Sequence, residues 1–241
     1  MRVSNRTIIA AACGVLSTVG VAQAHYLWLE PDEAGARLFY GEAEGGLKEK
    51  SPGKLDTIKA PRAFVLNQLS GQHKALTVSL TAGHFFVNGG GKSPALLATE
   101  GSLEVRDLTK HGLGMAKTNY YARYGQPKGP NDQFSFALDV QGRDPNKLTV
   151  LYRGQPLKGA KLEVIAPNTW VQEYRTDTQG RVAINTPWRG SYVIHVLHVD
   201  ATPGEFDGKK YESLRNHFTY TFLKADGADP GPAVPPSHGS D

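Results

Sequence analysis

The C-terminal half of the chain contains the β-rich stretch SYVIHVLHVD at Ser191–Asp200. Side chains alternate between the two faces of a strand, so His195 is expected to share a face with Val193 and Leu197. His198 is expected on the opposite face. Two histidines on opposite faces of a sheet cannot easily bind the same metal ion. The stretch therefore predicts a long strand that presents one histidine to each side of a sheet.

Similar β-rich runs recur along the chain and are separated by clusters of Gly, Pro, Asn and Asp. This pattern predicts a mostly β protein of antiparallel strands. Two loops, at residues 126–132 and 143–146, divide the runs into two groups. The first group comprises residues 36–40, 63–68, 75–81, 85–88, 103–108 and 134–140, and the second comprises 147–153, 161–166, 174–176, 181–184, 190–200 and 216–223.

We expect two domains from this division. Residues 25–140 would form a β-rich N-terminal domain with one short helix near residues 114–123. Residues 146–224 would form an immunoglobulin-like or transthyretin-like β-sandwich, because short strands and turns follow one another regularly there. Residues 225–241 contain almost no apolar side chains, which predicts a disordered tail.

The first 24 residues match a secretory signal peptide. Arg2 and Arg6 precede an apolar run at residues 7–21, and small residues, Ala22 and Ala24, stand at the positions that signal peptidase requires. We therefore expect export to the periplasm and a mature chain that begins at His25. No further segment of the sequence predicts a membrane span.

Composition limits the ligands that such a mature chain can offer. Cys13 is the only cysteine and would leave with the signal peptide, so thiolate metal sites and disulfides are excluded. Met115 would be the one remaining methionine, so metals must bind imidazole, carboxylate or main-chain nitrogen. The formal charge of +4 falls to +2 when Arg2 and Arg6 are removed. No stripe of Lys and Arg with interleaved aromatic residues indicates a nucleic-acid partner.

A histidine at a free N-terminus can chelate a metal ion. The α-amine and Nδ1 of His25 can bind one ion together, and a second histidine would complete a three-nitrogen site. Such sites suit Cu(II) and Ni(II). The alternative is that the exported chain simply begins with a histidine that has no ligand role.

Several motifs resemble a known family. They are an Ala-His-x-x-Trp-x-x-Pro opening at residues 24–31, an aromatic segment at residues 119–124, and the segments at residues 148–160 and 175–182. A strand containing His198, followed by Glu212 and Ser213, completes the set. The chain resembles the NikM-like or CbiK-like periplasmic family, identified with the periplasmic component of nickel/cobalt uptake. The resemblance implies that His25 and His198 are ligands and that Glu212 supports a ligand histidine.

The other histidines and acidic residues leave alternatives open. His217 could lie beside the preceding strand and supply a ligand, or it could be a polar residue that faces outward. His195 is a further candidate, and its alternative is a hydrogen-bonded core histidine. Glu42 and Glu44 could bind a cation or a sugar hydroxyl, although a solvated loop is the simpler interpretation.

We expect a non-enzymatic function: periplasmic binding of nickel, cobalt or copper for uptake or delivery, with a membrane metal-uptake system as the partner. A copper-dependent polysaccharide oxidase also begins with histidine and is one alternative. It would need an exposed aromatic surface around the N-terminus. A metal-free sandwich that binds a cell-surface partner is the other alternative.

Overall fold

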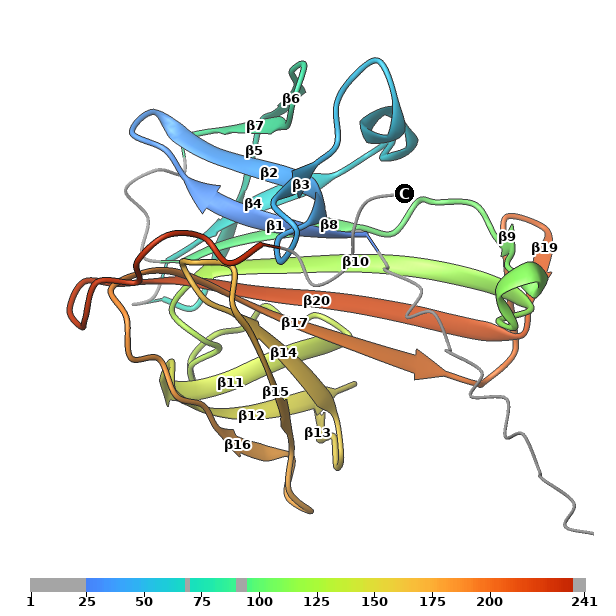
Figure 1. Ribbon diagram of the computed structural model, residues 1–241. Coiled ribbons are helices and arrows are strands. Elements are labelled where there is room, and N and C mark those ends of the chain that lie inside the picture. Colours follow the sequence, from blue (N-terminus) through green and yellow to red (C-terminus); the bar gives the residue numbers. More distant parts are fainter. Residues whose placement is uncertain (1–24, 68–69, 90–94, 236–241) are drawn as a thin grey trace, which may run out of the picture.

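The computed structural model describes residues 25–67, 70–89 and 95–235, so the expected signal peptide lies outside the described residues. The described chain is mostly β (Figure 1), which confirms the predicted fold class. The immunoglobulin-like or transthyretin-like character of its C-terminal part stays a prediction. No helix of the described chain is both long and apolar enough to cross a membrane.

The strands and the two short 3₁₀ turns follow one another along the chain. They are β1 (Tyr26–Pro31), β2 (Gly35–Glu42), β3 (Leu47–Lys48), η1 (Lys54–Thr57), β4 (Arg62–Leu66), β5 (His73–Leu76), β6 (Val78–Leu80), β7 (Phe85–Asn88), β8 (Ala95–Glu100), β9 (Arg106–Asp107), η2 (Thr109–His111), β10 (Met115–Gly125), β11 (Leu138–Asp144), β12 (Lys147–Tyr152), β13 (Gln155–Pro156), β14 (Lys161–Ile165), β15 (Val171–Arg175), β16 (Arg181–Ala183), β17 (Gly190–Asp200), β18 (Gly204–Phe206), β19 (Lys209–Tyr211) and β20 (Ser213–Lys224).

One large sheet runs through the whole molecule. Its strand order is β15-β14-β17-β20-β10-β8-β4-β5, with β9 paired to β10. Strands β10 and β20 lie parallel, in register from Ala116 opposite Ser213 to Tyr124 opposite Thr221. The sheet therefore joins strands from both sides of residues 140–146, where we expected a domain boundary.

The segment predicted to be a short helix is strand β10. Its aromatic run, Asn119–Tyr124, shows no simple alternation of apolar and polar residues, because side chains of β10 pack on both faces of the sheet. Tyr120 and Ala122 belong to the core on one face, and Tyr121 packs against the core on the other. A strand covered on both sides lacks the period of two that identifies a half-buried strand.

Two smaller sheets cover the two faces of the large sheet (Figure 1). The sheet β1-β2-β7-β6, with β3 beside β2, covers one face, and the sheet β11-β12-β13, with β16 beside β12, covers the other. Strand β8 shows the alternation plainly: Leu96 and Ala98 belong to the first core, and Leu97 to the second. The hydroxyl of Thr219 donates a hydrogen bond of 2.7 Å to the carbonyl oxygen of Leu27, which ties β1 to β20.

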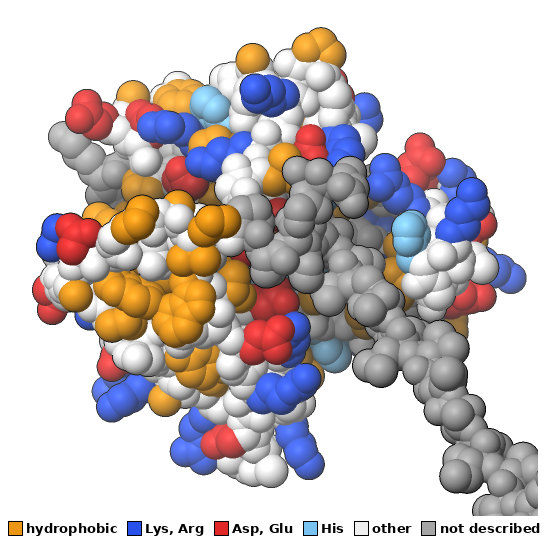
Figure 2. All heavy atoms as spheres, viewed as in Figure 1, with side chains coloured by type: hydrophobic (Ala, Val, Ile, Leu, Met, Phe, Trp, Pro, Cys, Tyr) orange, Lys and Arg blue, Asp and Glu red, His pale blue; other side chains and the backbone are white. Residues whose placement is uncertain are grey.

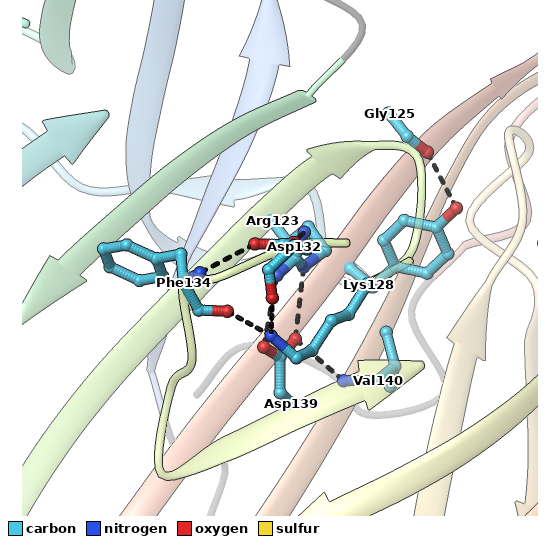
Figure 3. A network of polar contacts seen from close by, with 8 residues as sticks. Arg123, Gly125, Lys128, Asp132, Phe134, Asp139 and Val140 are labelled. Carbon is cyan, nitrogen blue, oxygen red and sulfur yellow. Dashed lines mark hydrogen bonds and ion pairs between the residues drawn. The ribbon is translucent and has the colours of Figure 1, made fainter. Parts of the chain in front are cut away.

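A buried ion cluster fixes the loop between β10 and β11 (Figure 3). Arg123 donates two hydrogen bonds of 3.1 Å to the carboxylate of Asp139 and one of 3.0 Å to Asp132. Lys128 donates to the carbonyl oxygens of Asp132 and Phe134. Burial raises the pKa of Asp139, and the opposing effect of Arg123 does not cancel it. Each charge in the cluster has a partner, as a buried charge requires.

Residues 225–235, for which we expected disorder, make main-chain hydrogen bonds to other parts of the chain. The amide of Ala228 donates to the carbonyl of Pro187 (3.0 Å), and the amide of Val234 donates to the carbonyl of Asn168 (2.7 Å). These main-chain bonds do not depend on apolar side chains, which explains why composition missed them. Residues 236–241, including His238, lie outside the described residues.

Figure 2 shows hydrophobic side chains gathered at the end of the large sheet where β20 ends. Exposed apolar side chains of the described chain include Trp170, Leu223 and Val234. On the same view, Lys and Arg side chains are interspersed with Asp and Glu side chains. A stripe of one charge is therefore not seen on this face.

Candidate functional site

His25 stands immediately before β1 and lies between two glutamates. Its Nδ1 is 3.0 Å from Oε1 of Glu42, and its Nε2 is 2.5 Å from Oε1 of Glu49. Glu42 is the last residue of β2, and β2 pairs antiparallel with β1, so the end of one strand is brought to the start of the other. The ring of His25 also contacts the ring of Tyr40, with 5.3 Å between centroids.

The two carboxylates have different electrostatic environments. Burial raises the pKa of Glu42, while His25 lowers it and Glu44 raises it further. Burial also opposes ionisation of Glu49, but hydrogen bonds from His25 and Lys54 outweigh it and lower the pKa of Glu49 overall. Glu44 accepts a hydrogen bond from the hydroxyl of Tyr26. Three glutamates thus lie around the residue at which the mature chain is expected to begin.

The simpler interpretation of Glu42 as a solvated loop residue is wrong, because Glu42 is 4% exposed and ends a strand. The sequence contains a signal that would have suggested this. Leu38, Phe39 and Tyr40 form an apolar run just before Gly41 and Glu42, and it extends β2 to Glu42. Glu49 was not a candidate, and no sequence signal singles it out, because β1, β2 and the loop after β3 meet only in the folded chain.

Among the described residues, no group of three or more His, Cys, Asp or Glu side chains is arranged to hold a metal ion. The geometry at His25 explains this result. Its two ring nitrogens point in different directions, so Glu42 and Glu49 lie on different edges of the ring and do not meet at one point. The side chains offer two neighbouring donors at most, Nδ1 of His25 and the carboxylate of Glu42, and a third donor must come from the main chain.

His195 and His217 are brought together inside the molecule. Nε2 of His195 is 3.1 Å from Nδ1 of His217, and Nδ1 of His195 is 3.1 Å from Oε2 of Glu163. The ring of Tyr26 stacks on His195 at 4.1 Å. Both nitrogens of His195 are thus engaged, and burial, together with the neighbouring His195 and Arg215, lowers the pKa of His217 well below its ordinary value.

His198 lies apart from the other candidate ligands, and within the described residues no hydrogen bond or ring contact links it to them. Its ring contacts Tyr152 at 4.3 Å between centroids, and the hydroxyl of Tyr152 donates to Asp200. Burial lowers the pKa of His198. Glu212, which the resemblance associates with a ligand histidine, accepts a hydrogen bond of 3.2 Å from the amide of Met115 instead.

The expectation of opposite faces for His195 and His198 agrees with these positions. In the part of the chain that the structure describes, neither they nor His217 has a hydrogen bond or ring contact with His25. The comparisons add no relative: no protein-family model, no curated protein and no solved structure matches this chain.

Proposed function

We propose that the protein binds a divalent transition metal in the periplasm through its mature N-terminus, for uptake or delivery. The ligands are the α-amine and Nδ1 of His25 together with the carboxylate of Glu42. The observation that carries the proposal is the 3.0 Å separation between Nδ1 and Oε1 of Glu42. Two donors that bind one metal ion at about 2.1 Å and at right angles to each other lie about 3 Å apart.

Glu49 supports this arrangement from the other side of the ring. Histidines that bind a metal through one nitrogen usually donate the other N–H to a carboxylate, which fixes the tautomer and the ring orientation. Nε2 of His25 has such a partner in Glu49, at 2.5 Å. Nδ1 is then the nitrogen that faces the metal, and it is also the nitrogen that can close a chelate ring with the α-amine.

The donor set favours particular metals. Two nitrogens and one carboxylate suit Cu(II) and Ni(II), and the resemblance to the NikM-like periplasmic family favours nickel or cobalt. The same resemblance supports a membrane uptake system as the partner that receives the metal. Polysaccharide oxidation has less support, because the aromatic side chains near His25, namely Tyr26, Trp28 and Tyr40, are buried.

The decisive experiment compares two forms of the exported protein, one that begins at His25 and one with an additional glycine before it. Isothermal titration with Ni²⁺, Co²⁺ and Cu²⁺ is expected to show at least a tenfold weaker affinity for the extended form, because its α-amine no longer closes the ring with Nδ1. Circular dichroism serves as the control for folding. Equal affinity of the two forms would disprove the chelate, and absence of binding by either form would disprove the function.

A further inference from the structure

Arg215, on β20, is a buried cation without a partner. It is 8% exposed, and among the described residues neither a hydrogen bond nor an ion pair reaches its guanidinium group. Arg123, by contrast, has two carboxylates. Burial of an unpaired charge is unfavourable, and burial lowers the pKa of Arg215. Arg123, the other buried arginine, is fully paired. The unpaired Arg215 therefore indicates a missing anion.

The guanidinium group of Arg215 is not completely enclosed. Within the described chain, the one fully buried side-chain polar atom without a hydrogen-bond partner is Oγ1 of Thr221. The unpartnered nitrogens of Arg215 are not in that class, so they keep contact with solvent. An anion that binds Arg215 would approach through this exposed part.

Arg215 lies on the face of the large sheet that β1 covers. Alternation along β20 places Arg215, His217 and Thr219 on one face, and Thr219 is bonded to Leu27 of β1. Tyr120 lies opposite His217 in the parallel pair β10–β20. Burial and the neighbouring Tyr40 raise the pKa of Tyr120, whereas Arg106 and Arg215 lower it. Both arginines therefore act electrostatically on the Tyr120 hydroxyl.

Two tyrosine rings connect this cationic group to the proposed metal site. Tyr120 contacts Tyr40 at 5.8 Å, and Tyr40 contacts His25 at 5.3 Å, both measured between ring centroids. A guanidinium group in the same part of the molecule as the proposed metal site repels a bare divalent ion. It attracts the same ion when the ion arrives within a negatively charged complex.

We propose that Arg215, assisted by Arg106 and the hydroxyl of Tyr120, binds a carboxylate of an organic chelate that carries the metal to His25. The inference rests on the proposed function and specifies its substrate: a metal complexed by a small hydroxycarboxylate or a similar polycarboxylate, and not the hydrated ion. Arginine suits this role because its planar fork binds a carboxylate through two parallel hydrogen bonds.

The test measures two forms of nickel against protein that begins at His25. Bare Ni²⁺ in a non-coordinating buffer and nickel citrate are titrated into the wild-type protein and into Arg215→Gln. We expect Arg215→Gln to bind nickel citrate at least tenfold more weakly than the wild type, and to bind bare Ni²⁺ equally well or more tightly. Arg181→Gln is the matched control, because Arg181 is exposed on β16 and is expected to change neither affinity.

The outcomes separate the two proposals. Unchanged affinity of Arg215→Gln for nickel citrate, or an equal loss for both forms of nickel, overturns the chelate site but leaves metal binding at His25 intact. Failure of the wild type to bind either form overturns both. Arg106→Gln provides a second variant at an exposed position should Arg215→Gln fail to fold. It is expected to weaken nickel citrate alone, by a smaller factor, and an unchanged affinity would overturn the site.

Discussion

His25 and His195 both contact glutamate, yet the two histidines have different surroundings. His195 has fixed partners at both nitrogens, Glu163 and His217, and Tyr26 stacks on its ring. His25 is also held by two carboxylates, but it lies at the start of β1, and its side chain is 17% exposed. The interior pair resembles a satisfied core network, whereas the ring of His25 is partly exposed. Residue type alone did not distinguish the two.

The largest expected effect tests whether the interior pair is structural. His217→Ala removes a fully packed ring and leaves Nε2 of His195 without its partner, so we expect a loss of about 2–4 kcal/mol in the free energy of unfolding. Urea denaturation measures the loss. His111→Ala, at an exposed position, serves as the control and should stay within about 0.5 kcal/mol of the wild type.

The metal affinity of the same variant tests the distinction between the two histidine regions further. The folded fraction of His217→Ala should bind Ni²⁺ as the wild type does. If the variant kept its stability and lost its metal affinity, His217 would be a ligand, and the distinction between the two histidine regions would fail.

A smaller effect concerns the dependence of stability on pH at Glu163. The hydrogen bond from His195 is the main cause that lowers the pKa of Glu163 to about 2 in the folded protein. The unfolded chain therefore binds more protons than the folded chain between pH 2 and about 4.5, so this stabilisation is complete above that range and is lost as the pH falls. Since Glu163 is partly exposed, its contribution is on the order of 2 kcal/mol.

Urea denaturation of the wild type and of Glu163→Gln across pH 2–6 measures this contribution. The difference in free energy of unfolding should be largest above pH 5 and should vanish near pH 2. A difference that does not vary with pH would show that the ionised form of Glu163 is not what stabilises His195.

The smallest expected effect concerns metal binding at His25. Glu49→Gln keeps the shape of the side chain but weakens the hydrogen bond to Nε2 of His25, so Ni²⁺ affinity should fall roughly tenfold. Calorimetry on protein that begins at His25 measures it, and His198→Gln is the matched control, expected to have no effect. Equal affinities for Glu49→Gln and the wild type would contradict the proposed role of Glu49.

Local patterns in the sequence predicted much of the fold but little of the site. Strand β17 is found at the predicted residues 190–200, and β7 at residues 85–88, because each forms a compact β-rich run. The identity of β10 was missed because a strand covered on both faces has no alternation to detect. Its parallel pairing with β20 joins residues about one hundred positions apart, which no local pattern records.

The candidate site shows the same limit. His25 was singled out because the expected cleavage would create a chelating N-terminus there, and the contact between His195 and His217 follows from two neighbouring strands. The roles of Glu42 and Glu49 depend on where β2 and the loop after β3 end in space, and Arg215 is distinguished only by the absence of a partner. Such properties belong to the folded chain and not to any short segment.

The position of β20 has a consequence for how the molecule assembles. Strand β20, the last strand of the described residues, lies in the middle of the large sheet, between β10 and β17, so this part of the sheet cannot pair until β20 is present. Nascent or truncated chains without β20 would expose two unpaired inner edges, which are templates for aggregation. Pairings between distant segments also slow folding. The inner edges of β10 and β17 are therefore protected only once β20 has paired with both.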